Sequence, residues 1–140
     1  MNASVQDRLR AVAQNAFRIV FGLMFMQHGA QKLLAMFGRE QAVPLFSQMG
    51  LAGVLELGGG LLIAVGLATR PVAFVLAGEM AWAYFQAHVP RGWVPSMNGG
   101  ELAVLYCFAF FFLAFHGGGA FSLDGLRARR KDGAARVASR

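Results

Sequence analysis

Four long apolar segments, separated by short breaks, dominate the chain. They cover residues 16–37, 51–68, 71–89 and 101–115. A helix needs about 20 apolar residues to cross the hydrocarbon core of a bilayer, within a range of about 17 to 25. The first three segments have this length, and the fourth is shorter but more apolar and can be extended by residues 98–100. The pattern therefore predicts an all-α fold, an integral membrane four-helix transmembrane bundle.

The breaks between these segments carry residues that end one helix and start the next. Pro71 follows a tight turn at residues 69–70 and is able to start a helix. Two prolines and a glycine pair in residues 89–100 forbid a continuous helix there. Asn98 followed by Glu101 is typical of a capped helix start, with a carboxylate three residues after the capping side chain.

Composition supports the membrane assignment and narrows the partners. Hydrophobic residues make up 56% of the 140 residues and charged residues only 14%, whereas soluble domains carry about a quarter. The formal net charge is +6, and six of the 13 Lys and Arg residues follow Leu126. No base-reading motif accompanies this basic tail, so we expect no nucleic acid partner. A basic segment beside a membrane helix instead marks the cytoplasmic side and contacts the lipid bilayer.

The distribution of basic residues also predicts the orientation. With both termini cytoplasmic, ten of the 13 Lys and Arg residues lie on the inner side, leaving Lys32, Arg39 and Arg91 in the outer half. The positive-inside rule favours this up-down arrangement of four crossings. The first apolar segment is too long for a cleaved signal peptide. Three regions follow: an amphipathic or disordered cytoplasmic lead (1–15), a transmembrane domain (16–116) and a basic cytoplasmic tail (117–140).

Ionisable and amide side chains interrupt the apolar segments at a few positions. We take six of them as candidates for ligand binding or proton handling: His28, Gln31, Lys32, Glu56, Glu79 and Glu101. A charge at mid-bilayer costs about 2.5–3.5 kcal/mol on insertion scales, so such residues normally face the bundle interior and pair.

The helix rise of about 1.5 Å per residue predicts which of these side chains meet. Lys32 and Glu56 each lie about 7.5 Å below the outer end of their helices. His28 lies one turn deeper, at about 13–14 Å, and Glu79 lies at about 15 Å. Two pairs are expected, Lys32 with Glu56 and His28 with Glu79. Gln31 can add a hydrogen bond to either pair.

We infer a polar pocket in the outer half of the bundle and a dry inner half. Gly22, Gly29 and residues 58–60 supply flat surfaces for close helix approach. Two interpretations of the pocket stay open: a ligand or proton site, or charge pairs that only hold the helices in register. For Glu101 the structural role as a helix cap is favoured. Arg18, near the inner end of its helix, is expected to snorkel to the membrane surface.

Other kinds of site have little support in the sequence. Cys107 is the single cysteine and lies in an apolar run, which excludes a dithiol centre within this chain and favours an inert thiol. No His-x-x-x-His or Glu-x-x-His pair occurs on one expected helix, so no metal site is predicted. Trp82, Tyr84 and Tyr106 are assigned to aromatic packing. No nucleophile lies beside a base, and catalytic residues stay unknown.

Several sequence motifs occur in a recognisable order. They are RIVFG and HGAQKL in the first apolar segment, LELGGGLLIAVGLATRP across the second, NGGELAVLY at the start of the fourth, and a closing GGGAFSLDGL. Together, over residues 17–126, they resemble the DoxX family of small bacterial membrane proteins. The resemblance implies a four-helix, multi-pass protein of the bacterial inner membrane. It also implies polar family positions at His28, Lys32, Glu56, Glu79 and Glu101.

The family resemblance suggests a link with redox chemistry. DoxX proteins are often oxidoreductase-associated subunits, and related DoxD proteins are linked with thiosulfate oxidation coupled to quinone. Another member is described in a membrane complex with a superoxide dismutase and a sulfurtransferase. The leading hypothesis is a redox- or stress-associated membrane subunit that binds a quinone-like or small polar ligand. Lys32 and His28 would hydrogen-bond a carbonyl or oxyanion, and Glu79 or Glu56 would accept the proton.

Two alternatives stay open. One is a non-enzymatic membrane scaffold that docks a soluble redox partner through the basic tail. The other is a small-solute transporter, which four helices would serve as a homo-oligomer, since they leave little room for alternating access and the chain has no visible inverted repeat. If the protein is an enzyme, the resemblance indicates a quinone-linked oxidoreductase subunit, with a quinone as the cofactor.

Overall fold

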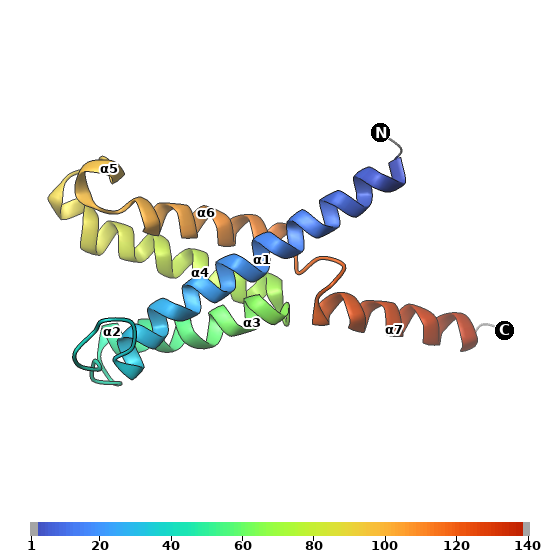
Figure 1. Ribbon diagram of the computed structural model, residues 1–140, viewed down its shortest axis with the longest axis horizontal. Helices are drawn as coiled ribbons and strands as arrows, with labels where there is room; N and C mark the ends of the chain where they lie inside the picture. The colour runs from blue at the N-terminus through green and yellow to red at the C-terminus, as the bar shows by residue number, and fades with distance from the viewer. Residues whose placement is uncertain (1–2, 139–140) are drawn as a thin grey trace.

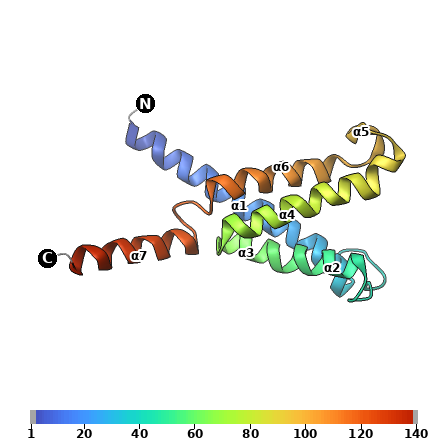
Figure 2. The ribbon, with the colours of Figure 1, turned by 180° about the vertical axis from the view of Figure 1, so that it is seen from behind.

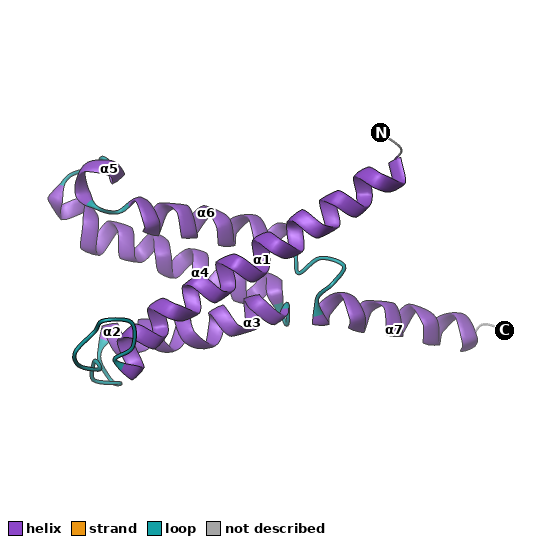
Figure 3. Cartoon of the chain, viewed as in Figure 1, coloured by secondary structure: helices purple, strands orange, loops and turns teal. Residues whose placement is uncertain are grey.

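The computed structural model describes residues 3–138, and every regular element in that range is helical (Figure 3). In chain order these elements are α1 (Ala3–Leu34), α2 (Gln48–Val54), η1 (Leu55–Gly59), α3 (Gly60–Val65), α4 (Thr69–Ala83), η2 (Tyr84–His88), η3 (Val89–Arg91), α5 (Pro95–Asn98), α6 (Glu101–His116) and α7 (Leu123–Ala138). Of the short elements, η1 and η2 are π-helical, and η3 is a 3₁₀ turn.

Four long helical rods lie side by side and alternate in direction (Figure 1). The first rod is α1, the second is the continuous run α2–η1–α3, the third is α4 with η2, and the fourth is α6. The first packs mainly against the second, and α4 packs against α6. The α1–α2 loop and α5 lie at one end of the bundle, whereas both chain ends lie at the other (Figure 2).

Two helical runs are long and apolar enough to cross a membrane, Ala3–Leu34 and Gln48–Val65. Helix α6 is also apolar but has only 16 residues. One face of α6 is exposed and the other is buried. Phe108 is 67% exposed and would face lipid, whereas Phe110 on the opposite face is fully buried. The bounds of the second and fourth rods lie within three residues of the segments that hydropathy predicts. Four membrane crossings remain a prediction.

The core of the bundle is a cluster of aromatic and branched side chains from all four rods. Phe25, Ile63, Leu76 and Phe110 are buried in it. The rings of Phe25 and Phe110 pack edge to face with centroids 4.7 Å apart, so α1 and α6 make contact through the centre.

Glycines bring α1 against the second rod, as the sequence predicts for Gly22, Gly29 and Gly60. The prediction is wrong for Gly58, where a Cβ atom would have no neighbouring heavy atom within 4 Å, and Gly59 faces Leu76 of α4 instead of α1. A Cβ atom added to Gly22 would lie 2.6 Å from the backbone nitrogen of Ala64, and one added to Gly60 would lie 2.8 Å from the carbonyl oxygen of Gly22. Gly29 is equally tight against Leu57. Such close backbone approach is typical of helix pairs in membranes, where packing replaces the hydrophobic effect as the main attraction.

Both ends of the chain are helical where the structure describes them. Helix α1 begins at Ala3 and runs through the expected lead without a break, and residues 1–2 lie outside the described range. The tail contains a 16-residue helix, α7, that projects from the bundle (Figure 1). The division into lead, transmembrane domain and tail stays a prediction.

The predicted helix cap at Asn98 is wrong. The residue at the N-cap position of α6 is Gly100, and no side chain caps it. Asn98 instead accepts a hydrogen bond from the Gly100 amide at 2.8 Å and donates to the carbonyl oxygen of Gly92. Asn98 therefore holds the turn between α5 and α6, while Glu101 is exposed in the first turn of α6.

Candidate functional site

A buried ion pair joins α1 to the second rod. The Lys32 ammonium near the end of α1 donates a hydrogen bond to Oε1 of Glu56 in η1, and the two side chains are only 18% and 4% exposed. This is the pair that their equal depth predicts. The other carboxylate oxygen, Glu56 Oε2, is buried and has no hydrogen-bond partner among the described residues.

The π-helical segment η1 sets the position of Glu56. π-helical turns insert an extra residue into a helix and occur frequently at functional sites. Gly58 and Gly59 lie in the same segment; a Cβ atom on Gly58 would have no neighbouring heavy atom within 4 Å, whereas one on Gly59 would lie 2.8 Å from the Leu76 side chain. A second π-helical segment, η2, follows α4 directly. Hydrophobic periodicity does not reveal either segment.

Glu79 of α4 lines the same cavity as Lys32 and Glu56. Both of its carboxylate oxygens are buried, and neither has a hydrogen-bond partner among the described residues. The predicted pair of His28 with Glu79 is therefore wrong. The His28 ring packs edge to face against Tyr106 instead, with centroids 5.8 Å apart, because it points toward α6 rather than α4.

The cavity between α2–η1 and α4 has a volume of about 430 Å³. Lys32, Glu56 and Glu79 line it together with apolar side chains that include Leu55 and Trp82. Gln48 and Gln86, which also line the cavity, are joined by a hydrogen bond between their side chains. Trp82 and Gly78 are exposed, so the cavity opens to the side of the bundle, where lipid would lie.

A smaller cavity of about 170 Å³ lies on the other side of the ion pair. Lys32 and Glu56 line both cavities, and His28, His88 and Tyr106 line only the smaller one. The Tyr106 hydroxyl is buried without a hydrogen-bond partner among the described residues. Unpartnered buried oxygens are costly in a low-dielectric interior, so their clustering here indicates a place for bound water or ligand. The Tyr106 ring itself packs against Phe21, Phe25 and Phe110, as the sequence predicts.

Two of the six predicted site residues do not join these cavities. The Gln31 side chain donates a hydrogen bond to the carbonyl oxygen of Phe37 at 3.2 Å and so holds the chain beyond the end of α1. Glu101 is exposed and lines neither cavity. The expected hydrogen bond from Gln31 to an ion pair is therefore wrong, and Glu101 does not join the cluster in space.

A second polar centre, at the opposite end of the bundle, has Arg18 at its middle. The prediction that Arg18 snorkels is wrong, because the side chain is only 1% exposed. Its guanidinium donates to the carbonyl oxygens of Ile63 at 2.7 Å, Gly118 at 2.9 Å and Phe121 at 3.3 Å, and also to Ala64. Carbonyl groups at a helix C-terminus have no partner within the helix, so the end of α3 attracts a cation.

The sequence contains one signal for this arrangement, the glycines opposite Arg18. Gly66 ends α3 with a φ of 71°, and a Cβ atom there would lie 3.0 Å from the centre of the Arg18 guanidinium. Only glycine combines that backbone conformation with that space. The run of glycines at residues 117–119 then leads the chain around the same side chain.

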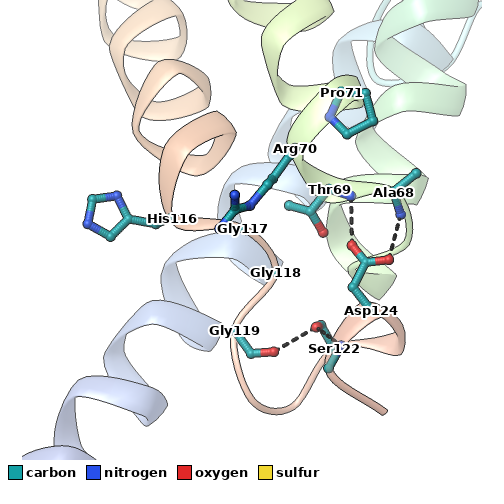
Figure 4. A pocket seen from close by; sticks show the side chains of 11 residues that line it. Ala68, Thr69, Arg70, Pro71, His116, Gly117, Gly118, Gly119, Ser122 and Asp124 are labelled. Carbon is teal, nitrogen blue, oxygen red and sulfur yellow. Dashed lines mark hydrogen bonds between the residues drawn. The ribbon is translucent and has the colours of Figure 1, made fainter. Parts of the chain in front are cut away.

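Asp124, in the first turn of α7, caps the start of α4 (Figure 4). Its carboxylate accepts hydrogen bonds from the amides of Ala68 at 2.9 Å and Thr69 at 2.8 Å. Partial burial alone would raise the pKa of Asp124. The amide hydrogen bonds outweigh that effect and lower the pKa below its ordinary value of 3.8.

Helical rods with a buried charge cluster and two runs apolar enough to cross a bilayer define a helical membrane protein. The DoxX family model matches residues 13–89, a range that contains Lys32, Glu56 and Glu79. The chain belongs to the DoxX family, a family of small bacterial membrane proteins.

A relative with a similar length supports this membership. The chain is 45% identical over 116 residues to an uncharacterized protein of Haemophilus influenzae, and the match covers 76% of this chain and 84% of that protein. No solved structure matches this chain.

Proposed function

We propose that this protein is a redox- or stress-associated membrane subunit that binds a quinone-like or small polar ligand between α2–η1 and α4. One observation carries the proposal. The Glu79 carboxylate lies in an apolar cavity beside the Lys32–Glu56 pair, and both of its oxygens are without a hydrogen-bond partner among the described residues. A buried carboxylate without hydrogen-bond partners is costly, so this position favours the binding of a ligand or water that donates a hydrogen bond to it.

The cavity suits a flat ligand with polar groups at its edge. Its volume of about 430 Å³ falls within the range of small-molecule sites, about 300–1,000 Å³. Its walls are apolar apart from a few convergent polar groups, which is also typical of such sites. Its lateral opening gives access to molecules dissolved in the bilayer. A bound quinone would supply two-electron chemistry linked to proton uptake or release.

The polar residues can each take a defined part in binding. The Lys32 ammonium has three N–H donors and uses one on Glu56, which leaves donors for a ligand carbonyl or oxyanion. Glu79 is free to accept a hydrogen bond or hold a proton at its carboxylate. His28 lines only the smaller cavity, on the opposite side of the ion pair from the ligand. It can therefore interact with Lys32 and Glu56 but not directly with the ligand.

We further propose that the protein crosses the bacterial inner membrane four times with both termini cytoplasmic. The end of the bundle that carries the chain termini also carries the N-terminal part of α1 with Arg10, the start of α4 with Arg70, and the basic α7. This distribution agrees with the positive-inside rule. The lateral cavity then lies in the outer half of the membrane. We also propose a soluble redox partner that would exchange electrons with the bound quinone.

Solvent extraction of the purified protein tests the ligand proposal. Wild type and three variants, Glu79→Gln, Lys32→Met and Glu101→Gln, are purified in mild detergent, and their extracts are analysed by absorbance and mass spectrometry. We expect a quinone or a similar amphiphile from wild type and from the Glu101→Gln control. Glu79→Gln and Lys32→Met should lose most of it. Equal ligand in all four proteins would contradict the proposal.

A docking scaffold is the second candidate function, and helix α7 favours it. Helix α7 projects from the bundle (Figure 2). Its residues 125–137 are almost all exposed and include a run of basic residues. A chain that ends after residue 126 keeps the Asp124 cap but lacks most of α7. If docking is the function, this truncation should abolish co-purification of a soluble partner, whereas Glu79→Gln should not affect it.

A further inference from the structure

An aromatic groove lies between the N-terminal half of α1 and the end of α6, far from the Lys32–Glu56 pair. It has a volume of about 570 Å³ and is lined by Arg10, Ala13, Gln14, Phe17, Phe112 and His116. The rings of Phe17 and Phe112 pack edge to face at 5.6 Å, and the His116 ring stacks on Phe112 at 3.9 Å. The groove is therefore apolar along its length, and its polar groups lie at the end nearest the chain termini.

A second hollow, of about 390 Å³, adjoins the groove at His116 (Figure 4). Arg70 reaches across this hollow toward Gly117, and its Nε would lie 3.2 Å from a Cβ atom placed on that glycine. Gln14, which lines the groove, donates a hydrogen bond at 3.1 Å to the carbonyl oxygen of Gly117, which lines the second hollow. Arg70 and His116 consequently flank the same loop residue, and both are exposed.

We propose that this surface binds one anionic phospholipid, with its phosphate at Arg70, His116 and Arg10 and an acyl chain along Phe17 and Phe112. Charge complementarity supports this occupant, because a guanidinium matches the geometry of a phosphate group. The one carboxylate of the hollow, Asp124, is occupied by the amides of Ala68 and Thr69. Arg10 pairs with Asp7 only in an exposed contact of 3.7 Å, which a phosphate can replace.

The groove distinguishes a lipid from a free phosphate ion. A phosphate ion would contact only the basic residues, whereas the apolar surface formed by Phe17 and Phe112 would contact the acyl chain of a lipid. Phe112 is 40% exposed, so its ring is accessible from the bilayer side. This inference goes beyond the proposed ligand pocket, because the two sites lie at opposite ends of α1 and share no residue.

Native mass spectrometry of the full chain in detergent tests the headgroup contact. Wild type is titrated with phosphatidylglycerol and, separately, with phosphatidylcholine of the same acyl chains. We expect tighter binding of phosphatidylglycerol, and about five-fold weaker binding in Arg70→Gln, the fold-change that corresponds to about 1 kcal/mol for one basic residue. Arg130→Gln in α7 removes the same charge outside the site and should leave binding unchanged. Equal binding of both lipids, or an equal loss in both variants, would overturn the proposal.

A groove-filling variant tests the acyl-chain contact separately. Ala13→Trp places a large side chain in the groove and keeps all three basic groups, so it should weaken phosphatidylglycerol binding. Ala134→Trp in α7 is the matched control and should bind as wild type does. Inorganic phosphate, added at constant ionic strength, should not displace the lipid. Displacement by phosphate, or unaltered binding in Ala13→Trp, would count against a lipid site.

Discussion

At the scale of single residues, the Lys32–Glu56 pair lies where the loss of one partner is costly. Removal of one charge of a buried pair leaves the other without compensation, at about 3–5 kcal/mol. We expect Lys32→Met to lower the free energy of unfolding by an amount in this range, as measured by denaturant titration in detergent. The double variant Lys32→Met/Glu56→Met should recover most of the loss, because it leaves no unpaired charge.

The matched control for these variants is Lys131→Met, in the exposed part of α7. It removes one cationic side chain without touching the bundle, so its free energy of unfolding should stay within about 0.5 kcal/mol of wild type. A double variant less stable than Lys32→Met would show that the pair does not act as a unit.

The sequence predicts a residue contact well when depth alone decides it. Lys32 and Glu56 lie at one level on neighbouring antiparallel helices, and they do form an ion pair. Equal depth does not fix which way a side chain points around its helix, and for that reason the expected pair of His28 with Glu79 is wrong. The role of Arg18 depends on carbonyl groups more than 40 residues away, which no local pattern reveals.

At the scale of helices, contact between α1 and the second rod depends on glycine. We expect Gly29→Ala to destabilise the protein by about 1–3 kcal/mol, because the new methyl group meets the backbone of Leu57 and the helices must separate. Gly58→Ala is the matched control, since a Cβ atom there has no neighbouring heavy atom within 4 Å. Thermal unfolding of both variants measures the difference, and a Gly58→Ala variant as unstable as Gly29→Ala would contradict it.

The contact of α7 with the start of α4 should depend on pH through Asp124. Because the folded pKa is lowered, the ionised carboxylate stabilises the fold above the unfolded value of 3.8. That stability is lost as the pH falls from 3.8 through the lower folded value. Asp124→Asn, which resembles the protonated side chain, should therefore be less stable than wild type at pH 7 by about 1 kcal/mol.

Unfolding measured from pH 7 down to about pH 3 tests this expectation, and the two curves should approach each other only below 3.8. Asp132→Asn, at an exposed position of α7, changes the same charge and should follow wild type throughout. A gap between wild type and Asp124→Asn that persists unchanged at low pH would rule out the ionised cap.

Hydropathy predicts the helices better than it predicts their internal irregularities. The apolar segments at residues 51–68 and 101–115 correspond closely to the second rod and to α6, because apolar length is the property that a bilayer selects. The π-helical segment at Leu55–Gly59 has no hydropathy signal, although it contains Glu56. The sequence pattern does not predict helix α7 either, because its residues are mostly polar and show little amphipathic periodicity.

At the scale of the whole molecule, helix α1 links two polar centres. Its C-terminal end carries Lys32, its middle carries the buried Arg18, and its N-terminal part carries Arg10. The cluster at Lys32 faces a lateral cavity, whereas Arg18 ties the loop before α7 to the end of α3. A ligand at one end and a lipid or partner at the other would therefore contact the same rigid helix.

The orientation of the bundle is the remaining whole-molecule prediction. Cys107→Ser leaves no native thiol, so a single new cysteine reports its own location. Ser96→Cys lies in α5 at the end opposite the chain termini, and Ala134→Cys lies in α7; both positions are exposed. With the termini cytoplasmic, a membrane-impermeant maleimide should label Ser96→Cys in spheroplasts, and Ala134→Cys only after the membrane is opened. The reverse pattern would place the Lys32–Glu56 pair in the inner leaflet, because this pair lies at the same end of the bundle as α5.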